Sequence, residues 1–192
     1  IDKAAAELFI RGPLLLRHGD AVIDTSALPY GCALHAPMLR EADIIDASAT
    51  VLKSYENKAN YLEACRRAAP NELIVFSSGY YSPSQRRFLS GIRRIMLRRS
   101  LAPEFYHSGD LDFGGINIFL HTREHVFPEL RSLDMGPDIL VKNLEYADRI
   151  KDEKYKAKLR RMLSGDRFSD FHPLIRCILK HNACLEQEAI LF

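Results

Sequence analysis

Apolar residues in the first third of the chain form strand-like runs and helix-like spacings. PLLLRHGDAVID (13–24) predicts two short strands around a Gly-Asp turn, and TVLKSYEN (50–57) predicts a strand that ends in polar residues. APMLREADIIDAS (36–48) carries apolar residues at helical spacing, and NYLEACRRAA (60–69) predicts a helix that stops before Pro70. The chain is therefore expected to open with a small hairpin and to continue with helix and strand in alternation.

The same alternation continues through the middle of the chain. ELIVFSSGYYS (72–82) predicts a strand with a glycine-marked exit, and the Ser-Pro start of the segment 82–99 suits a helix N-terminus. EFYHSGDLD (104–112) predicts the next strand, followed by a helix over 113–127. Strands and helices in this order are typical of an α/β fold, with a parallel sheet flanked by helices.

The remaining segments, 138–150, 153–163 and 172–192, predict helices. Because no repeat, Gly/Ser linker or low-complexity tract interrupts the chain, we expect one domain over 1–192. It would comprise a lead-in with small β elements (1–44), a core (about 45–145) and a C-terminal helical extension (146–192).

Composition is that of an ordinary soluble globular protein, with 47% hydrophobic and 27% charged residues among 192. No apolar run is long enough to span a bilayer. Four cysteines without C-x-x-C pairing indicate reduced thiols and a cytoplasmic location. The chain opens on Ile1 without a leader, so we expect a fragment of a longer protein. Neither a Walker-type phosphate loop nor a dinucleotide G-x-G-x-x-G motif occurs, which leaves ATP binding and hydride transfer without support.

Two carboxylates, Asp110 and Asp112, stand at the end of a predicted strand. Positions i and i+2 of a strand share one side, so both can face one hard divalent cation such as Mg²⁺ or Mn²⁺. Gly114 and Gly115 leave backbone space for a substrate at the N-terminus of the next helix, where an anion is favoured. The alternative is that the two aspartates only cap that helix.

Three stretches, VLKSYENKANY, ELIVFSSGY and HSGDLDFGGINIF, resemble the Toprim domain. The resemblance is to the form shared by the A subunit of type VI topoisomerases and, more closely, the C-terminal part of the Wadjet plasmid-defence nuclease subunit. With the closing LEQEAI it covers roughly residues 10 to 192. Glu56 matches the family's first acidic position, while Asp110 and Asp112 match its Asp-x-Asp. Gly114 stands where some topoisomerase-type sites have a third aspartate, and no tyrosine matches the type VI nucleophile.

The resemblance implies a Toprim nuclease that cleaves DNA phosphodiesters with Mg²⁺ or Mn²⁺. Asp110 and Asp112 would hold the metal, and Glu56 would act as general base or acid or as a third ligand. It further implies defence against plasmid or foreign DNA in a complex with an SMC-type ATPase, and we expect a homodimer through the full-length chain. The alternative is a non-catalytic or topoisomerase-like DNA-binding module that relies on a tyrosine from another domain.

Several basic residues are candidate DNA contacts. The predicted helix 82–99 carries six arginines, most of them on its outer face, and guanidinium groups suit phosphate. A solvated helix face is the alternative. His107 precedes the Asp-x-Asp and either reaches a phosphate or packs within the sheet. The residues expected to contact DNA are Arg86, Arg87, Arg93, Arg94 and His107.

Other ionisable residues are given ordinary structural roles. His121 and His125 are spaced for zinc but lack the order typical of metalloproteases, so we expect an exposed helix face. Glu186 and Glu188 reach the metal edge only if the C-terminal segment folds back, and we expect them to be surface acids.

Overall fold

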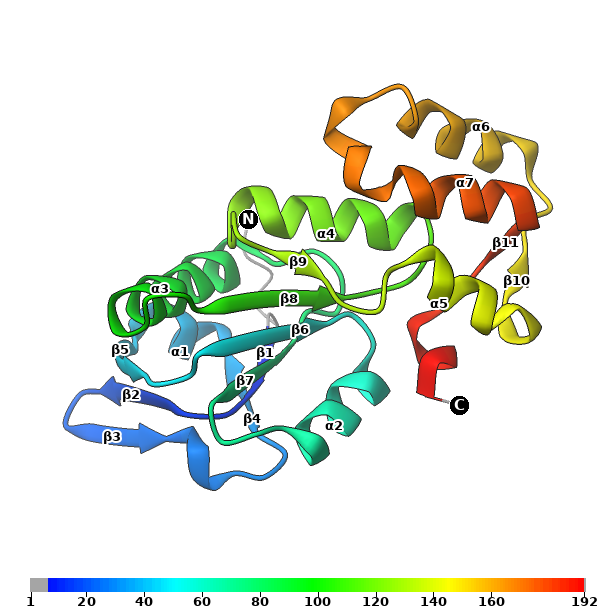
Figure 1. Ribbon diagram of the computed structural model, residues 1–192. Helices are drawn as coiled ribbons and strands as arrows, with labels where there is room; N and C mark the ends of the chain where they lie inside the picture. The colour runs from blue at the N-terminus through cyan, green and yellow to red at the C-terminus, as the bar shows by residue number, and fades with distance from the viewer. Residues whose placement is uncertain (1–6, 192) are drawn as a thin grey trace.

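The computed structural model describes residues 7–191. Its central sheet has six strands, of which four are parallel, and helices flank it (Figure 1). This arrangement confirms the predicted fold class. The strands in spatial order are β4 (Cys32–His35), β1 (Glu7–Arg11), β7 (Glu72–Phe76), β6 (Val51–Tyr55), β8 (Glu104–Ser108) and β9 (Arg131–Ser132). The first six residues of the expected lead-in and Phe192 lie outside the described residues.

The two faces of the sheet bury different helices. One face packs against α2 (Lys58–Arg67), where Tyr61 and Cys65 meet Ile74 of β7. The other face carries the main core, with α1 (Ala36–Glu41), α3 (Pro83–Arg99) and α4 (Phe113–His125). Because successive strand residues point to opposite faces, each buried central strand serves both helical layers.

A second, antiparallel sheet joins β3 (Ala21–Asp24), β2 (Leu14–His18) and β5 (Asp43–Ala47). The β2–β3 hairpin was predicted. The prediction of a helix throughout 36–48 is wrong in its second half, because α1 ends at Glu41 and the next residues pair with β2 as β5. Pairing with a neighbouring strand overrides the local helical spacing there.

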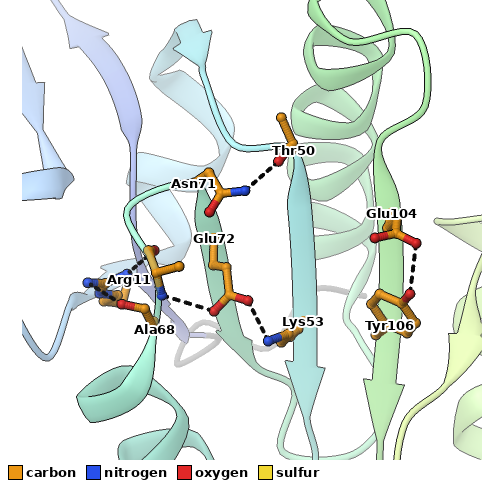
Figure 2. Close-up of polar contacts among 9 residues, drawn as sticks. Arg11, Thr50, Lys53, Ala68, Asn71, Glu72, Glu104 and Tyr106 are labelled. Carbon is orange, nitrogen blue, oxygen red and sulfur yellow. Dashed lines mark hydrogen bonds and ion pairs between the residues drawn. The ribbon is translucent and has the colours of Figure 1, made fainter.

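Polar contacts tie together the amino-terminal ends of the central strands (Figure 2). Lys53 Nζ pairs with Glu72 Oε1 at 2.5 Å, and the other carboxylate oxygen of Glu72 accepts from the Ala69 N–H at 3.2 Å. Asn71 Nδ2 donates to Thr50 Oγ1 at 2.7 Å. Charges at this edge of the sheet are therefore matched, in contrast to the carboxyl-terminal edge described below.

The C-terminal part is mainly helical, but 172–192 does not form one helix as predicted. The last α-helix ends at His181 because Asn182 adopts a left-handed conformation (φ 54°), and the chain then turns back toward the sheet. None of the helices within 7–191 is long and apolar enough to cross a membrane. The remaining elements are α5 (Pro137–Lys142), α6 (Glu153–Met162), α7 (His172–His181), β10 (Asp148–Arg149), β11 (Ala183–Cys184) and the 3-10 turns Thr25–Ala27, Leu144–Tyr146, Asp166–Phe171 and Gln187–Leu191.

Candidate acidic site

Two predicted acidic residues meet at the carboxyl-terminal edge of the sheet. Strands β6 and β8 are parallel neighbours, so Glu56 and Asp110 leave the sheet side by side. The Glu56 N–H donates to the Ser108 carbonyl at 3.1 Å, and the Asp110 N–H donates to Glu56 Oε2 at 3.4 Å. The parallel order thus brings together two carboxylates that are 54 positions apart in sequence.

The segment 182–191, here called the strap, folds back against this edge. Its Leu185 carbonyl accepts from the Leu111 N–H at 2.8 Å, just after β8. Both leucines are fully buried, so the contact is apolar as well as hydrogen-bonded. The strap is the red segment that returns from β11 toward the end of β8 in Figure 1.

Gln187 joins the strap to both acidic strand ends. Its N–H donates to Asp110 Oδ1 at 2.7 Å, and its side-chain Oε1 accepts from the Asn57 N–H at 2.7 Å. Asn60 Nδ2 donates to the Gln187 carbonyl at 3.0 Å. These bonds place the neighbouring Glu186 directly beside Asp110.

Three carboxylates consequently surround one small depression of about 230 Å³. Its lining includes no lysine or arginine among the described residues. The repulsion between carboxylates gathered in this way is usually relieved by a bound cation or by a retained proton. The lining residues are Glu56, Asn57, Ser78, Gly79, Asp110 and Glu186.

The pKa values of these carboxyls reflect their crowding. Burial, together with the negative charge of Asp110, raises the pKa of Glu56 to about 7. Burial also raises the pKa of Asp110. The Asp110 charge, followed by burial, raises the pKa of Glu186. Burial, for Glu56 and Asp110, and the charge of a neighbouring carboxylate, for Glu186, oppose ionisation most strongly, and a bound cation offsets both effects.

Asp112 has a different environment. Its Oδ1 accepts from the Gly115 N–H at 2.7 Å and so caps α4, while Tyr155 donates its hydroxyl to Oδ2 at 3.4 Å. The capping alternative is therefore the geometry observed for this side chain. Asp112 still contributes to the negative potential, because its charge raises the pKa of both Glu56 and Asp110.

The donor set fits Mg²⁺ or Mn²⁺ in its chemistry. All the donors are carboxylate oxygens, and Asp110 and Glu186 are close enough for the Asp110 charge to be the first cause of the raised pKa of Glu186. Within 7–191, however, no three acidic, histidine or cysteine side chains are already arranged to hold a metal ion. The residues that could hold one are Glu56, Asp110 and Glu186, with Asp112 adjacent.

His107 lies beneath this site and not on the surface. It is fully buried, with Nδ1 3.1 Å from Ser54 Oγ, and burial lowers its pKa to about 4. Its Nε2 has no partner among the described residues, and a Cβ added at Gly109 would lie 3.2 Å from Nε2 and 2.6 Å from Glu56 Oε2. The expected DNA contact is therefore corrected to the packed alternative, because a neutral, enclosed imidazole does not meet a phosphate.

The histidine pair on α4 makes local contacts. The His121 and His125 rings lie 4.1 Å apart, and His125 Nδ1 hydrogen-bonds the His121 carbonyl at 2.9 Å. Tyr80 packs edge-on against His121. Among residues 7–191 the pair has no further acidic, histidine or cysteine ligand arranged for zinc.

Comparison with known proteins assigns the family. The sequence model described as "Wadjet protein JetD, C-terminal" matches residues 12–192. The chain belongs to the JetD C-terminal family. The predicted resemblance to the Wadjet type is thereby confirmed. A curated relative, the Wadjet protein JetD of Bacillus cereus (strain Q1), is 28% identical over 184 residues, which are 96% of this chain and 44% of the relative. The chain thus spans less than half the length of that relative.

Glu186 is exposed, as expected of a surface acid, but the strap folds back and sets it beside Asp110. The alternative in which the C-terminal segment reaches the metal edge is therefore the geometry observed for this residue. The signal that pointed to it was the LEQEAI ending, through which the chain resembles the JetD type. Position in sequence gave no indication, because 75 residues separate Asp110 from Glu186.

Tyr155 links α6 to the start of α4 and provides a test of this geometry. The Phe113 N–H donates to its hydroxyl at 3.0 Å. Tyr155→Phe leaves that N–H without its partner, and we expect a loss of about 1 to 2 kcal/mol in unfolding free energy. Urea denaturation measures it, with the exposed Tyr30→Phe as matched control. Equal stabilities for the two variants would contradict a role for this hydroxyl.

Proposed function

We propose that this chain is the metal-dependent module that cleaves DNA phosphodiesters in a plasmid-defence complex. The observation that carries the proposal is the depression at the carboxyl edge of the sheet, where Glu56, Asp110 and Glu186 converge without a basic partner in its lining. Ligands of open α/β sheets gather at this edge. Membership of the JetD C-terminal family supports the same function.

The residues take distinct roles in this proposal. Asp110 and Glu186 would hold Mg²⁺ or Mn²⁺, and Glu56 would serve as a further ligand or as the group that takes up or delivers a proton. Asp112 fixes the N-terminus of α4 through Oδ1, while its Oδ2 accepts from the Tyr155 hydroxyl, so its part is to position α4 and to add negative potential. A bound divalent ion would polarise the scissile phosphate and stabilise charge on the leaving oxygen. The α4 N-terminus adds a favourable potential for the phosphate.

The proposed partners are duplex DNA, a second copy of the longer chain and an SMC-type ATPase. One acidic site can cleave one phosphodiester at a time, and the two strands of a duplex run in opposite directions. Two sites related by a twofold axis meet this demand, and isologous dimers are the commonest assembly. The name of the Bacillus cereus relative supports the wider defence context.

Divalent metal should stabilise the protein against heat. With a dissociation constant on the order of 1 mM, about 10 mM Mg²⁺ adds roughly 1.4 kcal/mol and raises Tm by about 3 to 6 °C. Asp110→Asn should remove most of this shift, since the amide is a weaker ligand yet still accepts from the Gln187 N–H. Glu188→Gln, which removes the same charge from the strap, is the control. A full shift in the Asp110 variant would refute the metal assignment.

The products distinguish hydrolysis from the topoisomerase-like alternative. Hydrolysis in Mn²⁺ leaves both DNA ends free, whereas transesterification leaves protein covalently attached to one end. Gel mobility of end-labelled DNA before and after protease digestion separates the two. A chain that binds DNA but never cuts it in Mg²⁺ or Mn²⁺ would favour the non-catalytic binding module.

A further inference from the structure

Some arginines of α3 are neutralised by acidic side chains. Arg93 makes a two-point contact with the Glu129 carboxylate, with Nε 2.8 Å from Oε2. Arg99 pairs with Asp46 at 2.5 Å. Because each of these guanidinium groups lies beside a carboxylate, its net attraction for another anion is weak.

Other arginines of the same helix line a groove between α3 and α1. Arg87, Arg94 and Arg98 recur at intervals of seven and four residues, which places them along one side of the helix. Together with Arg40 of α1 they border a cavity of about 300 Å³. Neither Arg94 nor Arg98 has a hydrogen bond or ion pair with another residue in the part of the chain that the structure describes.

The groove carries an excess of positive charge. Arg87 donates to the Arg40 carbonyl at 2.8 Å, which orients its side chain without neutralising it. Asp43 is the acidic residue of the lining, and its carboxylate already accepts from Arg17 at 3.0 Å. Four guanidinium groups therefore share one cavity that holds no free carboxylate among the described lining residues.

Close packing gives the groove a fixed floor. Gly91 lies between the arginine positions on α3, and a Cβ added there would come within 2.8 Å of Ile44 Cδ1. Glycine within a helix costs about 1 kcal/mol relative to alanine, and here it allows β5 to approach the helix. The arginines thus project from two packed elements and not from a loop.

We propose that this groove binds the sugar-phosphate backbone of duplex DNA. The inference rests on the proposed function and adds a second contact, away from the acidic depression. The row from Arg87 to Arg98 spans about 16 Å at 1.5 Å per helical residue. Such a row matches several successive backbone phosphates better than one compact anion, and guanidinium is well suited to phosphate oxygens.

The test compares two double variants with the same change in charge. Arg94→Gln/Arg98→Gln removes two positive charges from the groove. Arg93→Gln/Arg99→Gln removes two positive charges that are paired with Glu129 and Asp46. Binding of a 30-base-pair duplex is measured in EDTA over a series of salt concentrations. We expect the groove pair to lower affinity by at least about tenfold and the salt slope by about 1.8, at about 0.9 per phosphate contact. The control pair should change the slope by less than half as much.

The outcomes for the groove and for the nuclease are separable. Equal losses from both pairs, or competition by poly-glutamate as strong as by DNA, would overturn the groove. Suppose that the groove pair alone loses affinity and that the wild-type chain does not cleave DNA in Mn²⁺. The DNA-binding role of the groove would then stand, and the proposed nuclease activity would be refuted. Melting temperatures of all variants in EDTA test for unfolding. We expect little change for the groove pair, because Arg94 and Arg98 are exposed, whereas Arg93 is half-buried.

Discussion

Asp110→Ala should lower Mn²⁺-dependent nicking of supercoiled plasmid by about a thousandfold or more. Asp110 stands at the centre of the acidic depression, beside Glu56 and within hydrogen-bonding reach of Glu186. Loss of a group that stabilises transition-state charge typically costs two to three orders of magnitude, and here a metal ligand is lost as well. Rates are measured by gel from the disappearance of supercoiled DNA.

Absolute rates for this chain are expected to be low. Its net charge is only +2, and affinity for duplex DNA depends on the number of phosphates that the protein contacts. The comparison is therefore made at low salt, with Glu188→Ala as the control that removes another carboxylate of the strap. A variant at Asp110 that keeps more than a tenth of the wild-type rate would remove this residue from the catalytic set.

Gly115→Ala should destabilise the protein by about 3 kcal/mol, whereas Gly114→Ala should be nearly neutral. A Cβ at Gly115 would lie 2.1 Å from the Asp110 carbonyl oxygen and 2.9 Å from its backbone nitrogen, so the backbone must move. A Cβ at Gly114 would meet only the Asp112 side chain, at 3.3 Å. Thermal unfolding measures the difference, which corresponds to about 6 to 12 °C in Tm.

The same pair of variants tests how the acidic site is positioned. Displacing the Asp110 backbone should also reduce stabilisation by Mg²⁺ in Gly115→Ala, while Gly114→Ala should retain it. Similar melting temperatures for the two variants would show that α4 can move away from Asp110 at little cost. The proximity of helix and strand end would then be incidental to the site.

The parts of the fold that were predictable have local causes. Strand β7 is a short apolar run, and α3 begins where Ser82 and Gln85 form a reciprocal capping box after a glycine-marked exit. The alternation of such elements implied parallel strands, and hence a common edge for Glu56 and Asp110. These inferences needed no knowledge of distant contacts.

The parts that were missed depend on pairing between distant segments. Strand β1 lies antiparallel between β4 and β7, and nothing in its five residues specifies those neighbours. The spacing of the β5 residues predicts a helix, and their strand pairing is not visible locally because the partner in β2 is about 30 positions earlier. Register across a sheet is decided by tertiary packing, which outweighs local preference in short segments.

The candidate site was also predictable only in part. The Asp-x-Asp was recognised, but the side-chain roles were not separable from spacing alone, and Asp112 proved to cap α4. For the α3 arginines, amphipathic spacing gave an outer face. It could not reveal that Glu129 neutralises Arg93 while Arg94 lies in a groove, since the partners come from other elements.

Because the strap carries Glu186, the acidic site can open locally at a lower free energy than the fold as a whole. The hydrogen bonds of the strap to the central sheet are a short bridge at Leu111 and the bonds of Gln187, and Leu185 adds an apolar contact with the core. Detachment of a short segment costs less free energy than global unfolding, because the strands beneath keep their own ladders and most of the core. Glu186 can thus leave Asp110 while the sheet stays intact, so amide protons at the bridge should exchange with solvent ahead of those in β6 and β8.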